Sequence, residues 1–93
     1  MVESRKIYKV KVSKDAADFI RGMLGKIQRQ IRNKIKFVAK DPYNKGTKIK
    51  SSYGLFKTRS GNYRIAYKIK EDMILILVLR IGHRKDFYRY YER

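Results

Sequence analysis

The sequence contains no cysteine, no tryptophan, one histidine and one proline in 93 residues. Without cysteine the chain can form neither disulfides nor thiolate metal sites, and thiol catalysis is excluded. A single histidine and scattered carboxylates offer no recognisable set of metal ligands, so we expect no metal and no other cofactor. The longest apolar run, Met73 to Leu79, is far too short to span a bilayer, and the N-terminal residues lack the apolar core of a signal peptide. We therefore expect a cytoplasmic protein that does not bind membranes.

Acidic residues are also few: 8 Asp and Glu stand against 25 Lys and Arg, a formal net charge of +17. So large a surplus repels itself in the folded state, and an anionic partner is the usual compensation. Nucleic acid, an acidic protein, or each in turn would serve. Hydrophobic residues make up 43% of the chain, enough for one small core, so we expect a single domain over residues 1–93.

The N-terminal half predicts one strand followed by two helices. Residues 7–12 alternate between apolar and basic side chains, as a half-buried strand does. Ser13 is a suitable N-cap for a short first helix. A second helix carries an apolar stripe over residues 27–38 and a basic remainder, and Asp41-Pro42 ends it.

The C-terminal half predicts three strands. Residues 54–58 and 62–70 flank Ser60-Gly61, which is a hairpin signal, and residues 73–81 form a continuous apolar strand expected at the centre of the sheet. The tail from His83 onward is short, basic and rich in tyrosine. The predicted fold is α+β, with two N-terminal helices packed on a small antiparallel sheet (β-α-α-β-β-β) and a short basic C-terminal tail.

The hairpin suggests one site. If Ser60 and Gly61 are the two turn residues, Lys57 lies opposite Arg64 on the sheet face that the core tyrosines do not use. Like charges directly opposite one another destabilise a sheet unless an anion lies between them. The alternative is that both long side chains splay into solvent, and a slip of one residue would exchange the faces.

A second cluster follows the predicted central strand, where Gly82 to Tyr88 bring an imidazole, a guanidinium and a phenol together. Loops at strand ends carry functional sites more often than strand interiors do. His83 is the one side chain whose ordinary pKa lies near neutrality, although a lone histidine is more often an unremarkable surface residue. Together the two clusters contain the groups that cleave RNA without metal: cations for the phosphate, a proton acceptor for the 2′-OH, and assistance for the leaving 5′-oxygen.

An apolar strand separates two distinctive segments, Lys57 to Tyr67 and Gly82 to Tyr88. In these segments, and in length and element order over nearly the whole chain, the sequence resembles the RelE/ParE toxin superfamily. The specific motifs are G-x-Y-R-x-x-Y and G-H-R-x-x-x-Y. The resemblance implies a RelE-like toxin of a toxin–antitoxin pair, an endoribonuclease (mRNA interferase) that cuts mRNA in the ribosomal A site. Its implied partners are an acidic antitoxin protein, the mRNA and the ribosome.

The resemblance also implies catalytic roles for individual residues. Arg64 matches the arginine that stabilises the transition-state phosphate, and Lys57 matches a lysine that activates the 2′-OH. Arg84 matches an arginine that assists the leaving group, and Tyr88 matches a tyrosine that stacks near the scissile bond. His83 could be the general acid or base, as in histidine-using relatives. Further basic residues are predicted to bind the RNA: Lys48, Lys50, Arg59, Lys68 and Lys85.

The chain departs from the family pattern at Leu55, where the first lysine of a K-x-K strand motif is expected. Lys48 or Lys50 could replace that contact. The departure keeps open a ParE-like poison of DNA gyrase without nuclease activity. The composition is also compatible with a non-catalytic RNA-binding module, in which the basic groups only contact phosphates.

Overall fold

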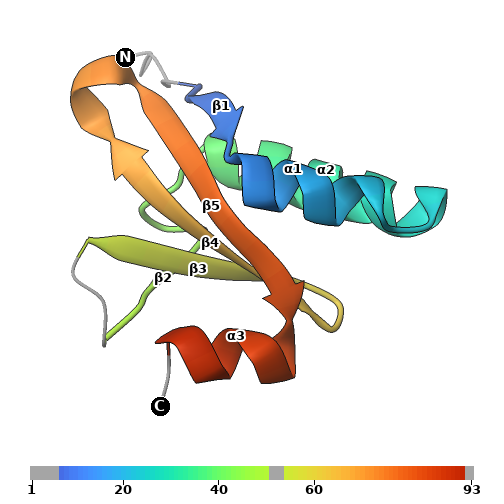
Figure 1. Ribbon diagram of the computed structural model, residues 1–93. Coiled ribbons are helices and arrows are strands. Elements are labelled where there is room, and N and C mark those ends of the chain that lie inside the picture. The colour runs from blue at the N-terminus through green and yellow to red at the C-terminus, as the bar shows by residue number, and fades with distance from the viewer. Residues whose placement is uncertain (1–6, 51–53, 92–93) are drawn as a thin grey trace.

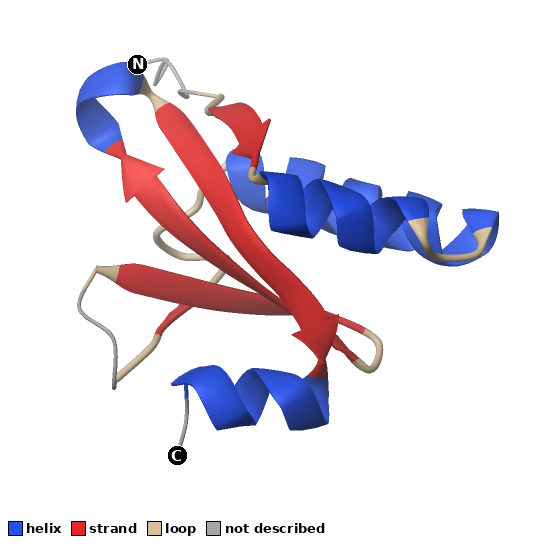
Figure 2. Cartoon of the chain, in the orientation of Figure 1, coloured by secondary structure: helices blue, strands red, loops and turns tan. Residues whose placement is uncertain are grey.

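The computed structural model describes residues 7–50 and 54–91, in which three helices surround one twisted five-stranded sheet (Figure 1, Figure 2). The strand order is β1-β5-β4-β3-β2, so the predicted apolar strand, β5, is an interior strand with a neighbour on each side. This confirms the α+β class and the two N-terminal helices. The elements are β1 (Lys9–Val12), α1 (Lys14–Arg21), α2 (Gly25–Ala39), β2 (Thr47–Lys48), β3 (Leu55–Ser60), β4 (Tyr63–Lys70), the 3₁₀ turn η1 (Glu71–Met73), β5 (Leu75–His83) and α3 (Arg84–Tyr91).

The sheet is mixed, whereas an antiparallel sheet was predicted. β1 pairs with β5 in parallel, with Val10 beside Ile76, while β2, β3, β4 and β5 pair antiparallel in turn. After β1, the two helices α1 and α2 carry the chain back to the end of the sheet at which β1 begins. Parallel pairing needs a long crossover connection of this kind. An alternating pattern in β1 reports which residues face the core and carries no information on the direction of its neighbour.

The helix boundaries follow local signals. Ser13 caps α1 as predicted: its Oγ accepts a hydrogen bond from the Ala16 amide at 3.1 Å and donates one to the Leu79 carbonyl at 2.7 Å. The second bond ties the start of α1 to β5. α2 buries Ile31, Ile35, Val38 and Ala39, and it ends before Asp41-Pro42 as predicted.

α1 and α2 cover one face of the sheet, where the main core lies, and α3 packs on the opposite face near the end of β5 (Figure 1). The main core centres on Ile65, Tyr67, Ile76 and Val78, all about 1% exposed. We call the face of the sheet opposite α1 and α2, on which α3 packs near the end of β5, the open face. Within the described residues, no helix is long and apolar enough to cross a membrane.

The predicted basic tail is in part a helix. The side chain of Phe87, 1% exposed, packs with Ile49 and Ala66, and Leu55 and Tyr91 border this smaller cluster. An eight-residue helix is too short to be stable in water alone, so α3 depends on this docking. Its amphipathic pattern is too short to predict a helix from the sequence.

Candidate active site

The β3–β4 hairpin turns one residue later than predicted. Ser60 pairs with Tyr63, so Gly61 and Asn62 are the turn residues, and Gly61 has a φ of +61°. Glycine with positive φ at the first central position is what a type II′ hairpin turn favours. The predicted pairing of Lys57 with Arg64 is therefore wrong: Arg59 lies opposite Arg64, and Lys57 lies opposite Ala66.

The corrected pairing still places three cations on the open face, because directly paired residues and alternate residues of one strand share a face. Arg59 and Arg64 now form the opposed like-charge pair, with Lys57 two residues along β3. The Arg64 guanidinium donates to the carbonyl oxygens of Gly61 at 3.0 Å and Tyr63 at 3.3 Å. These bonds hold it near the turn, in spite of the repulsion from Arg59.

These cations border a cavity of about 290 Å³. Two further lysines reach it from the helix side of the β3 edge: Lys34 from α2 and Lys45 from the loop before β2. None of the described residues that line it is acidic, and positive charges gathered in a hollow attract anions. Sequence reasoning missed Lys34 and Lys45, since nothing in the local pattern places them beside the hairpin. The lining residues are Lys34, Lys45, Gly46, Thr47, Lys57, Thr58, Arg59 and Arg64.

α3 begins beside the hairpin turn. The Arg84 amide donates to the Asn62 carbonyl at 2.9 Å, next to the Gly61 carbonyl that Arg64 uses. The structure thus brings the start of α3, with exposed Arg84 and Lys85, to the Arg64 end of the open face. Tyr88 lies in α3, and its side chain is outside the described residues.

His83 is placed differently. It pairs with Tyr63, whereas Gly82 pairs with Arg64, so alternation directs His83 toward the helix-covered face and Arg64 toward the open face. Its ring meets that of Tyr63 edge-on, with centroids 6.1 Å apart, and Nδ1 accepts a long hydrogen bond of 3.4 Å from the Lys85 amide. The structure does not bring His83 together with Lys57 and Arg64.

The predicted RNA-binding lysines divide between two places. Lys68 shares the face of Arg64, but Ala66, fully buried under Phe87, lies between them. Lys48 and Lys50 line a separate cavity of about 500 Å³ beside Tyr43 and Leu55.

Leu55 accounts for the departure from the family pattern. It packs against the Ile49, Ala66 and Phe87 cluster under α3, so an apolar side chain serves a structural purpose where a lysine was expected. Lys48 and Lys50 do not replace that lysine within the cavity of Lys57 and Arg64.

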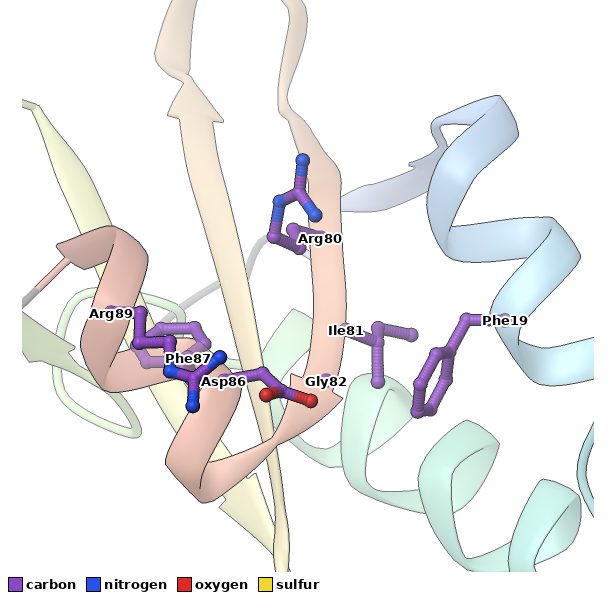
Figure 3. Close-up of a pocket in the computed structure, with 7 residues that line it drawn as sticks. All are labelled: Phe19, Arg80, Ile81, Gly82, Asp86, Phe87 and Arg89. Carbon is purple, nitrogen blue, oxygen red and sulfur yellow. The ribbon is translucent and has the colours of Figure 1, made fainter.

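A third cavity, of about 570 Å³, follows β5 past the end of its pairing with β1 (Figure 3). Phe19 and Ile81 lie on one side of the strand, and Arg80, Asp86, Phe87 and Arg89 lie on the other. Of the predicted catalytic residues whose side chains the structure describes, none lines it. The Arg80 guanidinium forms a salt bridge with Asp15 of α1, with 3.9 Å between its nitrogen and the carboxylate oxygen.

Two buried phenols stabilise the scaffold around the site. The Tyr67 hydroxyl donates to the Pro42 carbonyl at 2.7 Å, and burial raises the pKa of this tyrosine. Tyr8 donates to Glu71 at 2.6 Å, and this hydrogen bond together with burial raises the pKa of Tyr8 to about 12. Both side chains therefore stay neutral and act structurally. In the part of the chain that the structure describes, no group of His, Asp and Glu side chains could hold a metal ion.

The fold is one that RelE toxins of known structure share. Over 89% of this chain and 98% of the other, the structure resembles a RelBE toxin–antitoxin complex from Mycobacterium tuberculosis, with a TM-score of 0.78 and 21% identity. It resembles an isolated RelE toxin mutant from E. coli with a TM-score of 0.76 and 20% identity, over 90% of each chain. These likenesses show the fold.

Sequence comparison supplies the family. Residues 8–88 match the ParE toxin of the type II toxin–antitoxin system parDE. The toxin RelG of Mycobacterium tuberculosis is 42% identical over 36 residues, 39% of this chain. The matched segment spans 41% of that relative. The chain belongs to the ParE toxin family, within the RelE/ParE superfamily, and is a toxin of a toxin–antitoxin system.

Proposed function

We propose that this toxin is a ribosome-dependent endoribonuclease that cuts mRNA in the A site by attack of the 2′-OH on the neighbouring phosphate. The observation that carries this proposal is the cavity that Lys57, Arg59 and Arg64 share with two further lysines and, among the residues that the structure describes, with no carboxylate. Such preorganised cations stabilise a phosphate more strongly as negative charge grows in the transition state. The start of α3 beside the same hairpin turn adds Arg84 to this end of the face.

The proposed chemistry is one displacement at phosphorus. The 2′-oxygen forms a bond to phosphorus while the bond from phosphorus to the 5′-oxygen breaks. Lys57 orients and activates the 2′-OH, whose proton passes to a water molecule as the new bond forms, and Arg64 binds the non-bridging oxygens. Arg84 stabilises the charge on the leaving 5′-oxygen, which takes a proton from water. The products are a 2′,3′-cyclic phosphate and a 5′-hydroxyl.

Arg84 is preferred to His83 beside the leaving group because His83 faces the helix side of the sheet. Tyr88 is assigned to stacking on a base near the scissile bond, as its helix borders the open face. Arg59, Lys68 and Lys85 contact neighbouring phosphates. Lys48 and Lys50 are assigned to more distant RNA contacts, since they line another cavity.

The proposed protein partner is an acidic antitoxin in the cytoplasm, and the structures similar to this chain include complexes of RelE toxins with RelB antitoxins. Because the toxin carries a net charge of +17, the acidic antitoxin and the RNA should compete for its open face. A ternary complex formed through that face would contradict this assignment.

Poisoning of DNA gyrase is the second candidate. The ParE description of the matching family and Leu55 in place of the expected lysine favour it. A non-catalytic RNA-binding module would use the same cations for phosphate contacts alone.

The deciding experiment incubates the purified toxin with ribosomes carrying a defined mRNA and analyses the ends of the fragments. We expect 5′-hydroxyl ends and no cleavage when the nucleotide 5′ to the cut carries a 2′-deoxy sugar. Cleavage should be slow or undetectable without the ribosome, because the site alone does not splay and orient the strand.

Arg64→Ala should lower the cleavage rate by about 100- to 1000-fold, the typical effect of removing one transition-state donor. Its stability should change by less than about 1 kcal/mol, because water replaces the exposed hydrogen bonds and the repulsion from Arg59 disappears. Arg29→Ala, a matched change at an exposed position of α2 outside all these cavities, should cleave normally. Ends with a 5′-phosphate would reject this mechanism, and inhibition of supercoiling by purified gyrase without mRNA cleavage would establish the ParE-like activity.

A further inference from the structure

An aromatic ring is kept at the surface of α2 between two lysines. Phe37 lies outside the buried stripe of its helix and is 44% exposed. The Lys45 ammonium lies 4.3 Å from the centre of its ring, and the Lys34 ammonium lies 5.2 Å from it. Both lysines are half-buried, and they belong to the cavity of Lys57 and Arg64.

A shallow groove of about 610 Å³ connects Phe37 with the hairpin. It shares Lys34 and Arg59 with the cavity of Lys57 and Arg64, so the two hollows adjoin at the edge of β3. Within residues 7–50 and 54–91, no carboxylate lines either hollow. The groove is lined by Gln30, Asn33, Lys34 and Phe37 of α2 and by Arg59, Ser60 and Gly61 of the hairpin.

We propose that this groove binds a second nucleotide of the single-stranded RNA held at Lys57 and Arg64, with its base stacked on Phe37 and its phosphate between Lys34 and Lys45. The inference rests on the proposed function and extends its RNA site across the β3 edge. A basic groove with an aromatic platform is the arrangement that binds single strands. Duplex RNA does not fit the proposal, because its bases are stacked and paired within the helix.

The lysines beside Phe37 are compatible with base binding. A cation–π contact at an exposed site is weaker than stacking of a base on an aromatic ring. An arriving base can therefore displace one ammonium from the ring, and the adjoining phosphate then takes up that ammonium. Gln30 and Asn33 offer amide groups to the base edge without adding charge. An acidic peptide would use the lysines but would gain little from the ring.

The test measures binding of a fluorescent 2′-O-methyl nonauridylate, which lacks the attacking hydroxyl, to the full chain at several salt concentrations. Phe37→Ala should weaken binding about tenfold with an unchanged salt slope, and Phe37→Tyr should restore it, because a base stacks on either ring. Replacing both Lys34 and Lys45 by Gln should reduce the salt slope by about 0.7, the value for one phosphate contact on a single strand. Lys36→Gln, on the same helix but outside both hollows, is the matched control and should leave the slope unchanged.

Two results would overturn the inference. One is a Phe37→Ala protein that binds the nonauridylate as tightly as the wild type. The other is a Phe37→Ala protein that loses as much affinity for an oligoglutamate peptide as for the nonauridylate, which would make the groove a docking surface for an acidic protein. The two proposals fail on different results. A wild-type toxin that leaves ribosome-bound mRNA intact refutes the proposed nuclease activity, whereas the nucleotide site at Phe37 is tested by the binding measurements alone. Unchanged far-UV circular dichroism and melting exclude misfolding of these exposed-site variants.

Discussion

Removal of the Phe87 side chain tests whether α3 is a separately docked part of the active site. Phe87 is the buried anchor of an eight-residue helix, 1% exposed against Ile49 and Ala66. In a core that stays in place, Phe→Ala typically costs about 3–5 kcal/mol. Here the helix can detach instead, which returns backbone entropy of roughly 1–2 kcal/mol for each freed residue. We therefore expect Phe87→Ala to release α3 while the main core remains folded.

The loss of global stability should then be under about 3 kcal/mol, because the cluster around Ile65 and Tyr67 is untouched and detachment limits the penalty. Far-UV circular dichroism should lose the signal of a short helix, and hydrogen exchange should show α3 amides unprotected with β4 and β5 still protected. mRNA cleavage should fall sharply, since Arg84 loses its place beside the hairpin turn. Full protection of α3, or normal cleavage by a variant with α3 released, would refute this reasoning.

Two further predictions concern the scaffold. In Gly46→Ala the new Cβ would lie 2.8 Å from Cζ of buried Tyr67 and 3.0 Å from the Lys57 carbonyl oxygen, so we expect a destabilisation of about 1–3 kcal/mol in chemical denaturation; an unchanged midpoint would contradict it. The pKa of Tyr8 is raised from 10.0 to about 12 by Glu71 and burial, so its stabilisation is complete below pH 10 and is lost as the pH rises to 12. Tyr8→Phe should therefore make stability less dependent on pH in this range, by up to about 1.4 kcal/mol per pH unit, and an identical slope would argue against the bond.

Local patterns predicted much of this fold. The buried stripe of α2 was predicted correctly. The apolar strand was predicted over residues 73–81, whereas β5 spans Leu75–His83, because Met73 lies in the 3₁₀ turn η1 and Ile74 adopts positive φ. The direction of β1 was not predicted, because a strand's own residues do not reveal its neighbour. The hairpin was predicted, but its register depended on which residue adopts positive φ, and Gly61 takes the first turn position rather than the second.

The candidate site was predictable only where its residues are close in sequence. Arg59 and Arg64 belong to one hairpin, so a shift of one residue changed their partners but kept them together. Lys34 and Lys45 reach the same cavity through the packing of α2 and a loop, which no spacing rule anticipates. His83 was assigned from its chemistry, and strand alternation sends it to the other face.

The position of β5 between β1 and β4 has a consequence for synthesis of the toxin. β5 joins β1 to β4, and α3 continues directly from it, so neither the sheet nor the end of the site at Arg84 can form before residues 75–91 emerge. A growing chain that has only reached residue 74 can form the β3–β4 hairpin, but the β1 strand still lacks its neighbour. Pairing between residues so distant in sequence is slow, because loop closure precedes the contacts that stabilise it. A ribosome that translates this gene therefore meets no folded toxin from its own nascent chain until residues 75–91 have emerged.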